Sequence, residues 1–153
     1  MLDDRDRGLL SILQADAETP LSKISERLNL SASACSRRIA RLRAEGFITG
    51  QVATVDRHRL NLPTTVFALI RVTEHKAEGI ERFREAVQGI PEIVEAHRLT
   101  GHYDYLLEIA LPTIEHYDVV YRRLTARVGL AEVSACTSMD VLKAGTVLPT
   151  SYL

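Results

Sequence analysis

Apolar residues in the first third of the chain recur at helical spacing in three short segments. The first segment begins after Asp3, a residue type that caps helix N-termini. The second begins at Thr19-Pro20, which we interpret as an N-cap followed by proline in the first helical position. The third runs from the N-cap residue Ser31 to about Glu45. Because only a short turn separates the second and third segments, the pattern predicts a helix-turn-helix.

The periodicity changes after the third predicted helix. Apolar residues alternate with polar or small ones over 47–55, which predicts a small β-hairpin or a single strand, that is, a wing. Residues 56–63 are polar and basic, have no clear period and end in a proline. We therefore expect a winged helix-turn-helix over residues 1–55, a linker over 56–63 and a second domain over 64–153.

Helices and strands alternate in the second predicted domain. The pattern predicts six elements, in order a strand, a helix, two strands, a helix and a strand, over 66–72, 77–87, 93–100, 103–111, 113–128 and 133–141. This βαββαβ order is the ferredoxin-like arrangement, in which both helices cover one face of a four-stranded sheet. The predicted fold class is α+β, a winged helix-turn-helix followed by a ferredoxin-like domain.

The face of the sheet opposite the helices is expected to be too apolar for water. Leu106-Leu107 and the run from Phe67 to Ile70 place apolar side chains on both sides of their strands. A second copy of the chain is the simplest cover, since two-fold dimers are the commonest soluble assemblies. The alternative is that the first domain folds back over this face.

The composition is that of a soluble globular protein, with 46% hydrophobic and 25% charged residues. No apolar run approaches the roughly 20 residues that span a bilayer, and the first ten residues lack the pattern of a secretory signal, so a cytoplasmic protein without a membrane partner is expected. Cys35 and Cys136 lie far apart without metal-type spacing, so we expect reduced thiols and neither a metal site nor a cofactor.

The third predicted helix concentrates positive charge. Residues 1–62 carry 10 Lys/Arg and 8 Asp/Glu, and four of the ten are arginines that lie between Ser31 and Arg43 with no acid among them. At helical spacing, Cys35, Ile39 and Leu42 form an apolar stripe, and the opposite side holds small residues and arginines. A helix that enters the major groove needs slim side chains, base-edge donors and cations for phosphates, and this face has all three.

Groove geometry assigns roles along this helix. Residues near its N-terminus reach deepest, which makes Ser33, Ser36 and Arg37 the base-edge candidates, with Arg37 able to form two hydrogen bonds to guanine. The phosphate candidates are Arg38, Arg41 and Arg43, and Ser31 at the helix start completes the predicted DNA-binding set. The alternative is an arginine-rich solvated face without a DNA partner. Two such helices in a dimer would hold double-stranded promoter DNA better at cellular salt than one.

These residues also carry a family resemblance. The run LSASACSRRIARLRAEGFITG, preceded by LSKISERLNL and followed by the βαββαβ pattern with TGHYDYLLEI, resembles the Lrp/AsnC family of leucine- and asparagine-responsive transcription regulators. The resemblance covers essentially the whole chain. It implies a DNA-binding regulator that forms homodimers, often joined as tetramers or octamers, and that responds to an amino acid.

A loop between two predicted strands is the candidate effector site. In Gly101-His102-Tyr103-Asp104, glycine permits a tight turn and Asp104 could pair with an amino-acid ammonium group. The resemblance implies that this loop binds small ligands where dimers meet. Gly101, Tyr103 and Asp104 match the family motif, and His102 occupies its variable position. The alternative is a hairpin loop in which Asp104 caps its own backbone.

The last predicted strand provides two further effector candidates. Val133, Ala135, Met139 and Val141 are expected on one side, and the polar side holds Ser134, Cys136, Ser138 and Asp140. Cys136 and Ser138 are candidates to contact the effector, although a solvated edge strand predicts the same alternation. The resembling family often has small hydroxyl residues here, and Cys136 departs from that pattern.

Three other functions compete with an amino-acid-responsive regulator. An enzyme would depend on His97, His102 and Asp104, but no nucleophile with a neighbouring base and no phosphate-binding loop accompanies them, so no catalytic residue is expected. A metal- or redox-responsive winged-helix repressor would depend on Cys35 or Cys136. The third is an oligomeric ligand-binding module without DNA binding.

Overall fold

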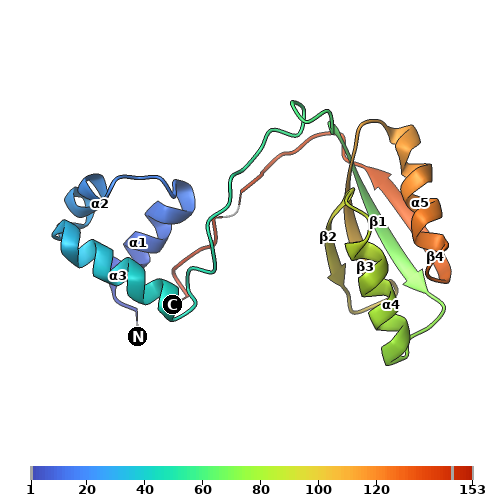
Figure 1. The fold of residues 1–153 in the computed structure, drawn as a ribbon, viewed down its shortest axis with the longest axis horizontal. Coiled ribbons are helices and arrows are strands. Elements are labelled where there is room, and N and C mark those ends of the chain that lie inside the picture. The colour runs from blue at the N-terminus through green and yellow to red at the C-terminus, as the bar shows by residue number, and fades with distance from the viewer. Residues whose placement is uncertain (1, 146, 153) are drawn as a thin grey trace. The chain divides into compact units, whose positions relative to one another are not determined.

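The computed structural model describes residues 2–145 and 147–152, which form two compact units (Figure 1). Residues 2–54 and the described residues after 142 form the N-terminal unit, and Val55–Leu142 form the C-terminal unit. The expected linker 56–63 therefore belongs to the C-terminal unit, and the end of the chain, which we expected in the second domain, belongs to the N-terminal one. Positions 1, 146 and 153, which the expected domains include, lie outside the described residues.

The N-terminal unit contains the three predicted helices, α1 (Asp4–Ala15), α2 (Leu21–Leu28) and α3 (Ala32–Ala44). Asp3 caps α1, and the Ser31 hydroxyl caps α3 by accepting a hydrogen bond from the Ala34 N–H at 3.1 Å, so both predicted caps are confirmed. The cap predicted at Thr19 is wrong by one residue. Pro20 itself has non-helical backbone angles, and its carbonyl accepts the first helical hydrogen bond.

A small apolar core holds the three helices together. Its fully buried members come from all three helices and are Leu9, Ile24, Cys35 and Leu42. Asn29 adopts the left-handed conformation between α2 and α3, which makes the tight turn predicted for a helix-turn-helix. Cys35 is therefore a core residue, as its place on the apolar stripe predicted.

The predicted wing strand is absent from the described residues. No residue between Phe47 and Val55 is paired in a ladder, and Val52 and Val55 are exposed. Ile48 alone of the alternating apolar residues packs against the helical core. The alternating pattern predicts a strand, but a strand needs a partner for its backbone N–H and C=O groups, and no other described segment pairs with residues 47–55.

The end of the chain lies against α1 in the N-terminal unit. The Gln14 side-chain amide donates to the Leu148 carbonyl at 3.2 Å and accepts from the Leu148 N–H at 2.7 Å. The hydroxyls of Ser11 and Thr150 are 3.2 Å apart. These contacts attach residues 147–152 to the helix-turn-helix, an arrangement that local sequence patterns do not reveal.

The C-terminal unit has the predicted βαββαβ order. Its elements are β1 (Thr64–Val72), α4 (Ala77–Gln88), β2 (Ile93–Arg98), β3 (Tyr105–Leu111), the short 3₁₀-helix η1 (Ile114–His116), α5 (Tyr117–Thr125) and β4 (Leu130–Thr137). The strands form one antiparallel sheet in the order β2-β3-β1-β4. This is the ferredoxin-like topology, with the second predicted helix divided into η1 and α5.

The last strand begins and ends earlier than predicted. β4 covers 130–137, and its ladder with β1 closes where the Ser138 N–H donates to the Thr65 carbonyl at 2.8 Å. Because β1 begins at Thr64, just after Pro63, β4 has no partner beyond this point. Met139, Asp140 and Val141 therefore lie outside the strand, and their predicted side assignments are wrong.

Both helices of the C-terminal unit cover the same face of the sheet. The core residues on β1 are Val66, Ala68, Ile70 and Val72, and they cluster with Phe83 of α4 and with Val120 and Leu124 of α5. The intervening β1 residues, Phe67 and Leu69, point to the other face and are only partly buried. We call this second surface the open sheet face. None of the described helices is long and apolar enough to span a membrane.

Candidate functional site

The exposed face of α3 presents the residues expected to read DNA. The side chains of Ser33, Ser36 and Arg37 are exposed along the first half of the helix, and the small residues Ala40 and Ala44 continue the face. The Ser31 hydroxyl is engaged in the helix cap and lies 3.1 Å from the Ser33 hydroxyl. Within the described residues, no hydrogen bond or ion pair holds the Arg37 guanidinium. The face is thus slim, and its most N-terminal arginine is free to bind an acceptor.

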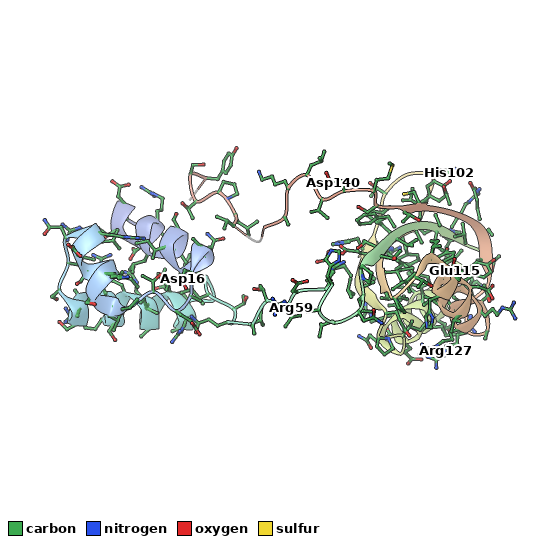
Figure 2. All side chains as sticks on the ribbon, turned by 90° about the horizontal axis from the view of Figure 1, so that it is seen from above. Asp16, Arg59, His102, Glu115, Arg127 and Asp140 are labelled. Atoms are coloured by element: carbon green, nitrogen blue, oxygen red, sulfur yellow. The ribbon has the colours of Figure 1, made fainter. Side chains whose placement is uncertain are left out.

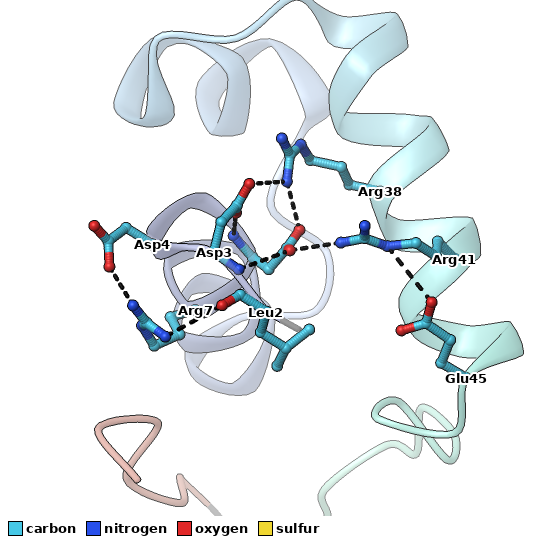
Figure 3. A network of polar contacts seen from close by, with 8 residues as sticks. Leu2, Asp3, Asp4, Arg7, Arg38, Arg41 and Glu45 are labelled. Atoms are coloured by element: carbon cyan, nitrogen blue, oxygen red, sulfur yellow. Dashed lines mark hydrogen bonds and ion pairs between the residues drawn. The ribbon is translucent and has the colours of Figure 1, made fainter. Parts of the chain in front are cut away.

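Two other arginines of α3 are held by the start of α1 (Figure 3). Arg38 Nη1 donates to Asp3 Oδ2 at 2.7 Å and to Asp6 Oδ1 at 2.8 Å. Arg41 Nη2 donates to Asp6 Oδ2 at 2.5 Å. The Asp6 side chain is 1% exposed, whereas those of Arg38 and Arg41 are 26% and 43% exposed. We call Asp3 and Asp6 the acidic pair.

The acidic pair is ionised in the folded unit. The Asp6 N–H and the Arg38 guanidinium lower the pKa of Asp3 from 3.8 to about 2. Burial by itself would raise the pKa of Asp6, but hydrogen bonds from Arg38, the Asp3 backbone and Arg41 outweigh it and lower that pKa. The same contacts raise the pKa of Arg38, first through Asp6 and then through Asp3.

The absence of acids among the α3 arginines in the sequence therefore does not leave all of them without acidic partners in the folded unit. No acid lies among these arginines along α3, but Asp3 and Asp6, 35 residues from their partners Arg38 and Arg41, supply two negative charges. Arg43 has a different environment and donates to the Gln51 side chain at 3.2 Å. Local spacing in the sequence does not identify Asp3 and Asp6 as partners of the α3 arginines. It predicts only that Asp3 caps α1.

The loop between β2 and β3 has the tight geometry expected of the effector candidate. Gly101 has a φ of +118°, a conformation that side chains disfavour, and the Leu99 N–H donates to the Asp104 carbonyl at 2.7 Å to close the hairpin. The Asp104 carboxylate accepts from the Val72 N–H at 2.8 Å and lies 3.1 Å from His75 Nε2. Asp104 thus ties the loop to the end of β1.

A second carboxylate joins this loop to β4. Glu132 lies 2.8 Å from His102 Nε2, and the Tyr103 hydroxyl donates to it at 2.9 Å. The hydrogen bonds from His102 and Tyr103 lower the pKa of Glu132, and the bond to Glu132 raises the pKa of Tyr103. The sequence reasoning missed Glu132 because strand register, rather than spacing, brings it to the loop.

Cys136 and Ser138 lie away from this loop. Glu132 pairs with Arg71 in the ladder, whereas Cys136 pairs with Phe67, four residues further along β1. At about 3.3 Å per strand residue this separates Cys136 from the loop end of β4 by about 13 Å. The structure therefore brings Gly101, His102, Tyr103 and Asp104 together within one subunit, and leaves Cys136 and Ser138 at the opposite end of the strand.

The C-terminal unit also has a cavity of about 230 Å³. It lies between the end of β1, the start of α4 and the residues after α5, and its charged lining residues are Glu74, Arg82 and Arg127. None of the predicted effector residues lines it, and in Figure 2 the labels of His102 and Arg127 lie on different sides of this unit. The cavity and the loop nevertheless both contact Val72.

Two family models match the chain. Residues 65–148 match the Lrp/AsnC ligand binding domain, and residues 2–49 match a winged helix-turn-helix DNA-binding model. Together they cover α1 to α3 and the sheet from Thr65 onward. The match to the ligand binding domain extends past Leu142, into residues that belong to the N-terminal unit.

Relatives and solved structures agree with these matches. The chain is 52% identical over 153 residues to the HTH-type transcriptional regulator Zrp of Zymomonas mobilis, and the alignment covers 100% of both chains. An AsnC family transcriptional regulator from Agrobacterium tumefaciens is 37% identical, with a TM-score of 0.94 over 99% of both chains. A transcriptional regulator from Neisseria meningitidis, solved in complex with L-Met, is 27% identical, with a TM-score of 0.93 over 99% of both chains. The chain belongs to the Lrp/AsnC family of transcription regulators, with an N-terminal helix-turn-helix for DNA and a C-terminal ligand-binding domain.

Proposed function

We propose that this regulator reads double-stranded promoter DNA through the N-terminal half of α3. The observation that carries the proposal is the exposed face on which Ser33, Ser36 and Arg37 lie beside the small residues Ala40 and Ala44. Among the residues that the structure describes, none is paired with the Arg37 guanidinium. Hydroxyls and a guanidinium can bind base edges only where the backbone approaches the groove closely, which these small residues allow. Arg43 is the phosphate candidate in the last turn of the helix.

The DNA-bound form is a homodimer joined through the open sheet face, and such dimers assemble further into tetramers or octamers. At the centre of that face, Leu69 pairs with Leu106 and lies next to Phe67. Polar side chains surround these three residues, among them His97, Glu108 and Ser134 at neighbouring ladder positions. An apolar centre with a polar rim is the ordinary pattern of a protein interface, and two-fold pairing supplies both recognition helices.

The effector is an amino acid bound at the β2–β3 loop. The family model names a ligand-binding domain, and the Neisseria relative was solved with L-Met, which supports an amino acid as the ligand class. Glu132 has a side chain 42% exposed and carries negative charge beside Tyr103, whereas Asp104 is already engaged with Val72 and His75. An ammonium group would therefore be bound mainly by Glu132, and Asp104, whose carboxylate holds the loop to β1, would supply a further oxygen. Because its partner is promoter DNA, the protein acts in the cytoplasm.

A gel-shift experiment tests these proposals together. The full-length protein is titrated at physiological salt against its own upstream region and against a shuffled fragment of the same composition, with each of the twenty amino acids in turn. We expect a shift specific to the upstream region that one or a few amino acids change. A specific shift with no amino-acid response, and no amino-acid effect on melting temperature at millimolar concentration, would contradict the effector assignment.

The same experiment separates the rival functions. A response to an oxidant or a chelator instead of amino acids would favour a redox- or metal-responsive repressor, with the exposed Cys136 as the accessible thiol because Cys35 is buried. Ligand binding without a shift on any promoter fragment would favour a module without DNA binding.

A further inference from the structure

The acidic pair neutralises two of the four arginines of α3. The positive charge that this helix presents to DNA is therefore smaller than its sequence suggests. Each Asp6 oxygen accepts from a different guanidinium, and Arg38 also reaches Asp3. Arg38, Arg41, Asp3 and Asp6 together carry no net charge. Arg37 and Arg43, which no carboxylate in the described residues neutralises, are left as the cations of this helix.

The geometry of the acidic pair is fixed by two reciprocal hydrogen bonds. The Asp6 N–H donates to Asp3 Oδ1 at 2.8 Å, and the Asp3 N–H donates to Asp6 Oδ2 at 3.2 Å. This capping box aims the remaining oxygens, Asp3 Oδ2 and Asp6 Oδ1, at the same Arg38 nitrogen. The α1 N-terminus therefore presents its carboxylates to α3 in one preorganised orientation (Figure 3).

The acidic pair and the DNA phosphates compete for Arg38 and Arg41, and the acidic pair binds them more strongly. If both arginines moved to phosphates, the carboxylate of Asp6, which is 1% exposed, would stay buried without a partner. Leaving a buried charge unpaired is among the most costly changes in a protein, whereas a phosphate contact at the surface is weakened by water and salt. The arginines therefore stay with Asp6 when the helix approaches DNA.

We propose that Asp3 and Asp6 limit sequence-independent DNA binding by keeping Arg38 and Arg41 off the phosphates, so that promoter selection depends on Ser33, Ser36 and Arg37. This inference rests on the proposed DNA-reading function of α3. It replaces the phosphate roles that the sequence suggested for Arg38 and Arg41.

The test measures how DNA affinity depends on salt. Binding of the full-length protein to a non-specific duplex is followed by fluorescence anisotropy between 50 and 200 mM KCl, for the wild type, Asp6→Asn and Asp3→Asn. Asp4→Asn is the matched control, because Asp4 lies on the same turn of α1 but pairs with Arg7 and is 93% exposed. Each phosphate contact adds about 0.9 to the slope of log K against log salt.

This proposal and a merely structural role of the acidic pair predict opposite changes in the salt slope and in non-specific DNA affinity. Because the asparagine keeps one acceptor oxygen and Asp3 still holds Arg38, Asp6→Asn frees about one arginine in each subunit. The slope then steepens by about 2 for a dimer, and non-specific binding at low salt tightens by about tenfold or more. Asp3→Asn, which leaves Asp6 in place, steepens the slope less, and Asp4→Asn leaves it within about 0.5 of the wild type. Weaker binding with an unchanged or shallower slope in both Asp6→Asn and Asp3→Asn would overturn the proposal.

Failure of this inference is distinguishable from failure of the proposed function. If the wild-type protein prefers its upstream region but the salt slopes of Asp3→Asn and Asp6→Asn equal the wild-type slope, this inference is contradicted and the proposed function is not. Wild-type protein that does not discriminate between promoter and shuffled DNA contradicts the reading role of α3. Hydrogen exchange on the same samples verifies that the Asp6→Asn variant is folded. If that variant is unfolded, the Asp3→Asn variant tests the proposal.

Discussion

Replacing Asp6 with asparagine is expected to destabilise the helix-turn-helix by about 2 kcal/mol. The buried carboxylate accepts charge-assisted hydrogen bonds from Arg38 and Arg41, and each such bond is worth about 1.5–3 kcal/mol. Asparagine keeps one acceptor oxygen, so one bond is lost and its amide group faces a guanidinium. Because the two arginines are partly exposed, they recover some hydration, which places the loss toward the lower end of this range.

Hydrogen exchange measures this loss in the full chain. A change of about 2 kcal/mol in local opening free energy lowers the protection of amides in α1 and α3 by roughly 30-fold, while amides of β1 and β3 in the other unit are unchanged. The Asp4→Asn control removes an exposed ion pair and costs less than about 0.5 kcal/mol. Equal protection in the two variants would refute the stabilising role of the buried carboxylate.

The pH dependence has a definite sign. The folded-state pKa values of Asp3 and Asp6 are lowered, to about 2 for Asp3, so the stabilisation is fully present above the ordinary value of 3.8 and is lost as the pH falls through the folded values. We expect acid unfolding of the N-terminal unit to be steeper in the wild type than in Asp6→Asn. Circular dichroism between pH 5 and pH 2 compares them.

Three further predictions concern the C-terminal unit. Leu69→Asp places a charge at the centre of the open sheet face and should weaken the dimer at least about 100-fold, because each subunit loses about 1.5 kcal/mol or more of apolar burial. A dimer dissociation constant in sedimentation equilibrium that equals the wild-type value would contradict the sheet-to-sheet interface. Glu132→Gln removes the charge that raises the pKa of Tyr103, so ultraviolet titration should show that tyrosine ionising at lower pH, and an unchanged titration would show that the contact is not made. Asp104→Ala should abolish an amino-acid response that Arg127→Gln, in the separate cavity, leaves intact, and the reverse result would move the effector site to the cavity.

Local sequence patterns predicted the elements because each is specified by nearby residues. Ser31 caps α3 and Asp3 caps α1 through hydrogen bonds that span three residues, and apolar stripes mark the buried sides. The βαββαβ order followed from the same periodicities, since β1 is buried on its helix side at every second residue.

Features that depend on distant partners were not predictable in this way. The acidic pair meets Arg38 and Arg41 across more than 30 residues, and the end of β4 is set by where β1 begins after Pro63. Glu132 reaches the effector loop through ladder register alone. The prediction of a wing strand was wrong because an alternating pattern does not show whether a partner strand exists.

The measurement that tests the central claim most directly is the ratio of affinities for the upstream region and for shuffled DNA in Arg37→Ala. Arg84→Ala is the control, because it removes the same charge from an exposed position on α4, in the C-terminal unit. If Arg37 binds a base edge with about 1–3 kcal/mol of discrimination, the ratio should fall by about tenfold or more while the dimer persists and Arg84→Ala keeps the wild-type ratio. An unchanged ratio in Arg37→Ala would contradict the claim that α3 reads promoter DNA through this residue.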